Sequence, residues 1–349
     1  PMVNGGASGT ASTWQDNAGI YGGNTLLLSN GAVANVNAGG QLQSHKLTVS
    51  NATINLAGTG GLDTTNSAFL LASNYGSPTD GASISLNNAT VNVQGEDEDV
   101  EYTGNILIAP TGNKGASIST TNTTFTIGAG NNLLIGVAPG ADGSATNIST
   151  NSGGATVALN TGTIINNEGT VELTEVSSAD FATEGKYVVT TLANGATINN
   201  TSADSAFVIN AGNRFVMNGG VINNSGLIDI QSGAVASAEE QATTNADGSV
   251  LTDGVTTLSG NINVGGILKV VSGSTLEIAA GSNLSTNTVI TGDVKATEGS
   301  GNGSIQVIGD EDSGAAVLKI DSATLKNFLT AGDAAVVGNG VDTAGALYI

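Results

Sequence analysis

The chain has 349 residues, no cysteine and one histidine, and its 29 acidic against 8 basic side chains give a formal net charge of −21. Because so few basic residues cannot neutralise a row of phosphates, nucleic acid is excluded as a partner, and an anionic membrane surface would repel the chain. The lack of cysteine excludes disulfides, thiolate nucleophiles and cysteine-based metal sites, and no apolar run approaches the roughly 18 residues of a membrane-spanning helix.

Residues 1–46 carry short apolar runs separated by Gly- and Asn-rich turns, which predicts N-terminal capping coils made of short strands. Trp14, the one tryptophan, is interpreted as a plug for the open end of the core, with an exposed platform for carbohydrate as the alternative. His45 lies in an ordinary strand pattern, so we expect it on the surface of a strand. The first residues lack the basic and apolar regions of a signal peptide, so we expect a mature chain or a piece cut from a longer one.

Residues 47–160 contain the clearest internal repeat. In each copy two short alternating runs flank a turn with Asn at the same offset, and a third apolar run follows. The copies begin with LTVSNATINL (47–56), ISLNNATVNV (84–93) and ISTTNTTFTI (118–127), and their third runs are 68–72, 105–109 and 132–137. A period of roughly 30–37 residues, made of three strands and three turns, is typical of a β-solenoid. We therefore predict an all-β solenoid in which each coil pairs with the next.

Within one coil, the alternation predicts which side chains form the core and which lie at the turns. The predicted inward positions are Ile84, Leu86, Val91, Val93, Ile106 and Ile108. In this register Asn51, Asn88 and Asn122 stack at one turn, and we expect their amides to form a structural hydrogen-bonded ladder. Each is also the first residue of an Asn-x-Thr triplet, which we interpret as a by-product of the turn, because a buried ladder residue could not be glycosylated.

The densest charge in the sequence is the acidic run at 96–101. The favoured interpretation is a solvated acidic loop, because the spacing matches neither an EF-hand nor a calcium-binding nonapeptide repeat. The alternative is a weak calcium site, since the side chains of Glu96, Asp97, Glu98 and Asp99 supply the carboxylate oxygens that Ca²⁺ prefers. We expect that no cofactor is required, with Ca²⁺ as the one possible exception.

Residues 161–316 continue the solenoid with a different motif. An I-N-x-x-G frame recurs in TIINNEGTVEL (163–173), VINNSGLIDI (221–230) and NINVGGILKV (261–270). We expect its glycines, Gly169, Gly226 and Gly266, to turn corners in a left-handed conformation. The less regular stretches 172–187 and 237–254 are predicted to be loops or a β-hairpin that projects from the shaft.

Residues 317–349 are predicted to hold the last coil and a cap. Asp321 or Ser322 is a suitable N-cap, and apolar Leu325, Phe328 and Leu329 follow at helical spacing before Gly332. A short amphipathic helix here would cover the end of the solenoid, whose core and strand edges would otherwise be exposed.

The Asn- and Gly-rich coils, TIINNEGTVEL and VINNSGLIDI above all, resemble the passenger domains of Gram-negative autotransporter adhesins of the AIDA, pertactin and antigen 43 type. The resemblance covers about two-thirds of the chain. It implies a right-handed parallel β-helix, export to the bacterial cell surface, and a role in adhesion, self-association or biofilm formation. The predicted fold class is therefore a right-handed parallel β-helix with irregular loops and a short C-terminal capping helix.

No catalytic residues are predicted. The single histidine has no nucleophile-elbow motif beside it, and no carboxylates recur at stacked strand positions, so we expect no enzymatic activity. Nor does a Thr-x-Thr array, the pattern of ice-binding solenoids, persist through successive coils.

The sequence favours a non-enzymatic extracellular adhesin or self-association protein, anchored at the outer membrane or secreted. Its expected partners are further copies of itself or ligands on host cells, cell surfaces or matrix, without membrane insertion. Expected contact regions are 75–80, 96–101, 172–187 and 237–254. One alternative is a structural subunit of an S-layer, sheath or filament. Another is a polysaccharide-active β-helix enzyme, for which the only clues are Tyr21, Tyr75 and Tyr102.

Overall fold

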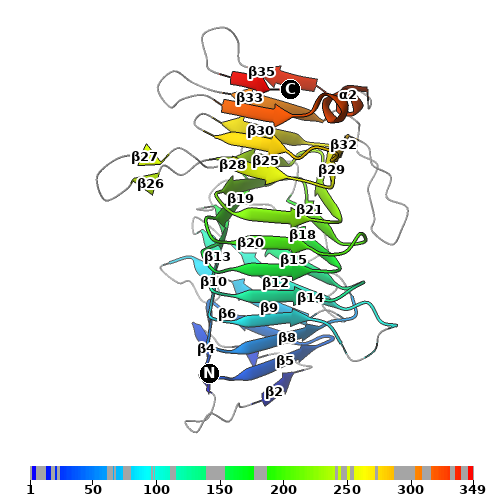
Figure 1. The fold of residues 1–349 in the computed structure, drawn as a ribbon. Coiled ribbons are helices and arrows are strands. Elements are labelled where there is room, and N and C mark those ends of the chain that lie inside the picture. Colours follow the sequence, from blue (N-terminus) through cyan, green and yellow to red (C-terminus); the bar gives the residue numbers. More distant parts are fainter. Residues whose placement is uncertain are drawn as a thin grey trace.

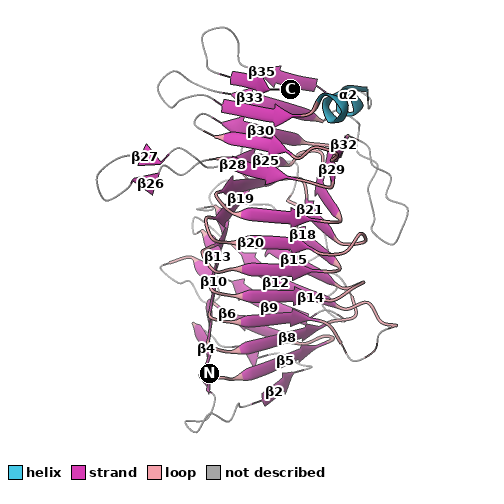
Figure 2. Ribbon diagram, in the orientation of Figure 1, coloured by secondary structure: helices cyan, strands magenta, loops and turns pink. Residues whose placement is uncertain are grey.

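A computed structural model describes residues 2–4, 13–16, 20–21, 24–60, 66, 68–73, 80–95, 97, 99–110, 115–138, 154–176, 187–239, 243–244, 250–251, 255–271, 274–286, 303–308, 316–330, 335–338 and 345–348. Over these residues the chain winds into stacked coils whose sheets run along one axis, from the blue N-terminal end to the red C-terminal end (Figure 1). Strands make up nearly all of the regular structure (Figure 2). The predicted class, a right-handed parallel β-helix, is confirmed.

Three long parallel sheets carry the coils. The twelve-stranded sheet contains, in spatial order, β1 (Met2–Asn4), β4 (Thr25–Ser29), β7 (Lys46–Ser50), β10 (Ala82–Asn87), β13 (Ala116–Thr121), β16 (Ala155–Leu159), β19 (Val188–Ala193), β22 (Asn213–Asn218), β25 (Val235–Ala238), β30 (Ile267–Val271), β33 (Ser304–Ile308) and β35 (Ala335–Gly338). The eight-stranded sheet contains β2 (Thr13–Asp16), β5 (Val33–Asn37), β8 (Thr53–Ala57), β11 (Thr90–Val93), β14 (Thr124–Ile127), β17 (Ile164–Asn167), β20 (Thr197–Asn200) and β23 (Val221–Asn224). The ten-stranded sheet contains β3 (Ile20–Tyr21), β6 (Gln41–Ser44), β9 (Ala68–Ser73), β12 (Thr103–Ala109), β15 (Asn132–Val137), β18 (Thr170–Leu173), β21 (Ala206–Ile209), β24 (Leu227–Ile230), β29 (Asn261–Val264) and β32 (Asn283–Ser285).

After β23 the eight-stranded sheet gives way to a separate four-stranded sheet. Its strands are β28 (Val255–Leu258), β31 (Thr275–Ile278), β34 (Ala316–Ile320) and β36 (Gly345–Tyr348). Between β25 and β28 the chain forms an antiparallel hairpin, β26 (Thr243–Thr244) and β27 (Val250–Leu251), which projects from the stack in Figure 1. The hairpin predicted within 237–254 is confirmed.

The main apolar core runs through the inside of the coils. The predicted inward side chains Ile84, Leu86, Val91, Val93, Ile106 and Ile108 are all at most 1% exposed. They stack on equivalent residues of neighbouring coils: Ile84 pairs in register with Leu47 on one side and Ile118 on the other. Because strand side chains alternate between faces, the parallel register turns each coil's inward set into a continuous column.

The stacked turn asparagines have a different role from the one predicted. Asn51, Asn88 and Asn122 do occupy the same turn in successive coils, but each has a left-handed backbone, with φ of 50°, 48° and 45°. All three side chains are exposed, and Asn51 Nδ2 donates to its neighbour Ser50 Oγ (3.3 Å). No hydrogen bond joins the three amides to one another, so their contribution is a left-handed conformation that Asn tolerates better than most residues.

The expectation of left-handed corner glycines at Gly169, Gly226 and Gly266 is wrong, because none of the three has a positive φ. Instead each lies against backbone of the preceding coil. A Cβ at Gly226 would lie 2.0 Å from the carbonyl oxygen of Ser205, so the corner is too close for any side chain. Gly266 also lies at a different corner from Gly169 and Gly226. It follows β29, which pairs with β24 in the ten-stranded sheet, whereas Gly169 and Gly226 follow strands of the eight-stranded sheet.

The C-terminal helix α2 (Ser322–Thr330) is confirmed, and Asp321 is its N-cap: Asp321 Oδ1 accepts hydrogen bonds from the backbone N–H groups of Ala323 (3.0 Å) and Thr324 (3.1 Å). The hydroxyl of Thr324 also donates to Asp321, and this bond holds the pKa of Asp321 below its usual value. Leu325 and Phe328 are buried as predicted, whereas Leu329 is 45% exposed and does not join the core.

The helix caps one sheet, not the whole solenoid. Thr324 Oγ1 donates to the carbonyl oxygen of Ser282, just before β32, the last strand of the ten-stranded sheet (3.2 Å). The other two sheets continue past the helix to β35 and β36. The twelve-stranded sheet also runs without a break through the predicted boundaries at 46/47 and 160/161.

The positions of His45 and Trp14 were also predicted from the sequence. His45, expected on the surface, is 3% exposed at the corner between β6 and β7, so the expectation was wrong. Trp14 lies on β2 with its backbone paired to Ala34, but its side chain lies outside what the structure describes, so the plug stays a prediction. Among the described residues, no helix has the length and apolar character needed to cross a bilayer.

Candidate functional site

The outer face of the eight-stranded sheet presents two straight rows of uncharged side chains, which we call the amide face. Outward positions alternate with the buried ones along each strand, and the register aligns them across the coils. One row consists of β-branched residues: Val33, Thr53, Thr90, Thr124, Ile164, Thr197 and Val221. The second row consists of Asn35, Asn55, Asn92, Thr126, Asn166, Asn199 and Asn223.

The asparagines of the second row are joined by side-chain hydrogen bonds. Asn55 Nδ2 donates to Asn35 Oδ1 (2.6 Å), and Asn92 Nδ2 donates to Asn55 Oδ1 (2.8 Å). After the interruption at Thr126, the pattern resumes through Asn166, Asn199 and Asn223, with donor–acceptor distances of 2.9 and 2.8 Å. Amide ladders therefore exist in this solenoid, but on the strands of the amide face, with each bond holding the next side chain in a fixed orientation.

A second ladder is buried directly behind the first, at the end of the same strands. Asn167 Nδ2 donates to Asn200 Oδ1, and Asn200 Nδ2 donates to Asn224 Oδ1, both at 2.9 Å. Asn167 and Asn200 are at most 1% exposed. Asn167 also donates to the carbonyl oxygen of Ala206, and Asn200 donates to that of Leu227, both on the ten-stranded sheet. This ladder satisfies polar groups at a corner of the core and fixes the register on which the outer rows depend.

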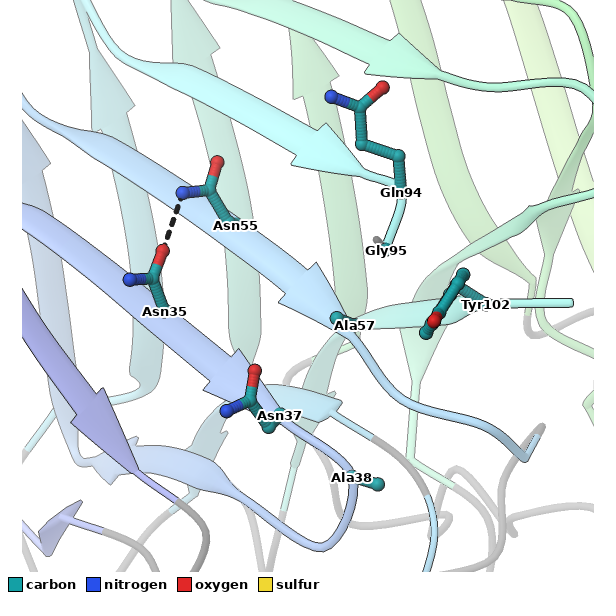
Figure 3. A pocket seen from close by; sticks show the side chains of 8 residues that line it. All are labelled: Asn35, Asn37, Ala38, Asn55, Ala57, Gln94, Gly95 and Tyr102. Carbon is teal, nitrogen blue, oxygen red and sulfur yellow. Dashed lines mark hydrogen bonds between the residues drawn. The ribbon is translucent and has the colours of Figure 1, made fainter. Parts of the chain in front are cut away.

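A cleft of about 560 Å³ opens where the amide face meets the corner toward the ten-stranded sheet (Figure 3). It is lined by Asn35, Asn37, Ala38, Asn55, Ala57, Gln94, Gly95 and Tyr102. Figure 3 shows the asparagines on β5 and β8 at one side, Gln94 and Tyr102 at the other, and Ala57 between them. The lining thus combines a short apolar floor with side-chain amides and one aromatic ring.

Tyr102 is held in this cleft by three contacts. Its hydroxyl accepts a hydrogen bond from the backbone N–H of Asp97 (3.3 Å), and its own N–H donates to Asn131 Oδ1 (2.8 Å). Gly95 lies directly against the ring, since a Cβ there would come within 1.9 Å of Tyr102 Cζ. The absence of a side chain at position 95 is therefore what allows the ring to lie where it does.

The structure describes only part of the predicted calcium site. Asp97 and Asp99 are exposed, and the backbone N–H of Asp99 donates to Asp97 Oδ1 (3.0 Å), while Glu96 and Glu98 lie outside the described residues. Among the residues whose placement is given, no three His, Asp or Glu side chains lie close enough to hold a metal ion. Calcium binding by the full run stays a prediction.

The other predicted contact regions are described in part. Residues 74–79 and 177–186 lie outside the described residues. Asp80, at the end of the first of these, is exposed and forms an ion pair with Lys46, which lowers the pKa of Asp80. Its Oδ1 also lies 3.6 Å from His45 Nε2.

Among the described side chains, one carboxylate is buried, on the ten-stranded sheet. Asp229 is 2% exposed and accepts hydrogen bonds from Asn263 Nδ2 (2.8 Å) and from Gln231. Burial raises the pKa of Asp229, and the two hydrogen bonds partly oppose that effect. Both of its hydrogen-bond partners among the described residues are side-chain amides.

No family model and no curated protein matches the chain. Among solved structures, it is similar to the crystal structure of a fragment of TibA that was hyper-glycosylated by TibC. That similarity covers 99% of this chain and 97% of that chain, with 15% sequence identity and a TM-score of 0.21. The β-helix assignment follows from the strand pairing of this chain itself.

Proposed function

We propose that this protein is a non-enzymatic adhesin of the bacterial cell surface, with the β-helix as its shaft and the amide face as its contact surface. The observation that carries the proposal is the pair of uncharged rows aligned over successive coils. Extracellular location, and anchoring at the outer membrane or secretion, belong to the same proposal and rest on the sequence resemblance.

Electrostatics favour contact at this face. A chain with a net charge of −21 repels other acidic surfaces, including further copies of itself, wherever its carboxylates are exposed. The two rows carry no charged side chain, so a partner can approach them without that cost.

The amide face also combines two kinds of contact. Ile164 and Val221 are 38% and 50% exposed, which offers apolar area on the β-branched row. The asparagines beside them offer hydrogen bonds from side chains already held in place by their ladder, so little side-chain entropy is lost on binding.

Catalysis is not supported by the described residues. His45 is buried, no potential metal-binding cluster is present in the described ranges, and Asp229 has amide partners only. Binding without chemical change needs none of these groups.

The test combines sedimentation with retention on surfaces. Purified protein is sedimented over a concentration series, with Ca²⁺ and with chelator, and labelled protein is washed over cell layers and matrix-coated plates. A monomer or reversible dimer that is retained supports an adhesin. Growth into fibres or sheets without retention would instead identify a structural subunit of a sheath, S-layer or filament. Turnover of a polysaccharide in the same samples would contradict the proposal.

A further inference from the structure

We infer that the cleft beside Tyr102 is a binding site for an uncharged oligosaccharide. The inference deepens the proposed function, on which it rests, by naming the chemical class that an adhesin with this face would hold. The cleft volume of about 560 Å³ lies within the range of small-ligand sites, about 300–1,000 Å³.

The amides supply the hydrogen-bonding chemistry that sugar hydroxyls need. A hydroxyl both donates and accepts, and a side-chain amide offers two donors and an acceptor. Asn37 and Gln94 line the cleft and make no side-chain hydrogen bond to any described residue, so their groups are available to a ligand. Asn35 and Asn55 are held by their ladder bond, which fixes two further amides along the same wall.

Tyr102 supplies the apolar surface. A pyranose ring has a face of C–H groups that packs on an aromatic ring, and Tyr102 is half-buried in the cleft wall with Gly95 against it. The contact from the N–H of Asp97 to the tyrosine hydroxyl holds the ring before any ligand arrives. A preformed ring and fixed amides reduce the entropy that binding would otherwise cost.

The charges around the ring select against acidic sugars. Asp97, Asp99 and Glu101 are all exposed beside Tyr102, and the described lining residues carry no positive charge. A carboxylate or sulfate on the ligand would therefore meet like charge with no cation to offset it. The cleft is suited to neutral hexoses and N-acetylhexosamines, not to uronic or sialic acids.

The cleft also continues into the amide face. Asn35 and Asn55 belong both to its wall and to the outer row of β5 and β8. A longer polysaccharide seated on Tyr102 could extend along this row, so the site suits an oligosaccharide better than a free monosaccharide.

The experiment uses the full chain and titration calorimetry. The probes are neutral oligosaccharides of glucose, galactose, mannose and N-acetylglucosamine, and, as acidic probes, sialyllactose and oligogalacturonate. We expect saturable binding of at least one neutral probe and none of the acidic ones. Tyr102→Ala and Asn37→Ala should each weaken binding about tenfold, while Tyr102→Phe, which keeps the ring, should weaken it less than about threefold.

Matched controls lie elsewhere on the same shaft. Tyr187→Ala removes a half-buried tyrosine, and Asn160→Ala removes a half-buried asparagine that donates to Ser119 Oγ and lies off the amide face; both should bind the neutral probe like the unaltered chain. Asn37→Ala and Gln94→Ala break no described hydrogen bond, so they should test the cleft even where Tyr102→Ala disturbs folding. The inference is overturned by the absence of binding to every neutral probe, by unchanged affinity in the Tyr102→Ala and Asn37→Ala variants, or by preference for the acidic probes.

These outcomes separate the two proposals. Retention on cells without binding to any sugar overturns the saccharide site and leaves the adhesin standing. Sugar binding without retention on any surface overturns the adhesin and leaves the site.

Discussion

The buried amide ladder gives the sharpest quantitative prediction, because adjacent asparagines on β20 differ only in the face they occupy. Asn200 is 1% exposed; it accepts a hydrogen bond from Asn167 and donates to Asn224 Oδ1 and to the carbonyl oxygen of Leu227. Asn199 points outward and is half-buried; it donates to Asn166 and accepts from Asn223. Substituting each by Ala therefore compares an inner and an outer rung of neighbouring ladders.

The magnitudes follow from burial. Asn200→Ala removes three hydrogen bonds, each worth about 1 kcal/mol net, and leaves buried acceptors on Asn224 and Leu227 without their donors. We expect a local loss of about 3–5 kcal/mol. Asn199→Ala removes two bonds at a surface where water replaces them, so its loss should stay below about 1 kcal/mol.

Native-state hydrogen exchange is the suitable assay, because long repeat arrays need not unfold in one step. The opening free energies of amides in β17, β20 and β23 are compared among the unaltered chain and the two variants. A difference between the variants of less than about 0.5 kcal/mol would refute the reasoning, since the inner rung would then contribute no more than the outer one.

Three further changes test other parts of the structure. Burial raises the pKa of Asp229 above its unfolded value, so its ionisation lowers the stability of the fold progressively as the pH rises above about 4. The gain in melting temperature from Asp229→Asn should therefore be larger at pH 7.5 than at pH 4.5. An equal gain at both pH values would contradict this. Gly226→Ala places a Cβ 2.0 Å from the carbonyl oxygen of Ser205, so thermal unfolding should show a clear loss of stability. Its control is Gly281→Ala, because a Cβ at position 281 meets nothing within 4 Å. This control should show only the smaller effect of the positive φ at Gly281. Phe328→Ala removes a fully buried side chain under α2 and should lower the opening free energy of α2 and β32 by about 3–5 kcal/mol. Leu329→Ala, at an exposed position, should lower it by less than about 0.5 kcal/mol. Hydrogen exchange of the amides in α2 and β32 measures both values.

The sequence predicted what depends on local alternation. Ile84 and Leu86 could be assigned to the core from spacing alone, because a period of two determines which side chains share a face. The capping helix was equally visible, since Asp321 and the apolar residues that follow carry a local signal.

The amide face could not be predicted from local alternation. Asn55 and Asn92 are 37 residues apart, Asn166 and Asn199 are 33 apart, and Asn199 and Asn223 are 24 apart. The rows emerge only when these unequal coils are placed in register, so a search for identical Thr-x-Thr repeats missed them. The available signal was a β-branched residue two positions before Asn in six of the seven strands of the eight-stranded sheet from β5 to β23.

Other differences arose where one residue type serves two purposes. A corner glycine satisfies either a left-handed backbone or a close approach of two coils, and Gly169 and Gly226 serve the second. A turn asparagine likewise suits either a ladder or a left-handed turn, and Asn88 serves the turn. Sequence alone gave no way to distinguish these, because the deciding contact comes from another coil.

The most direct test of the central claim places a charge on the amide face. Thr124→Glu lies on the β-branched row, and Thr191→Glu is its control, a half-buried outward threonine on β19 of the twelve-stranded sheet. Both variants gain the same charge, so their retention on cell layers and matrix-coated plates can be compared directly. The account predicts that Thr124→Glu loses retention while Thr191→Glu keeps it; equal retention of the two would contradict the assignment of the amide face as the contact surface.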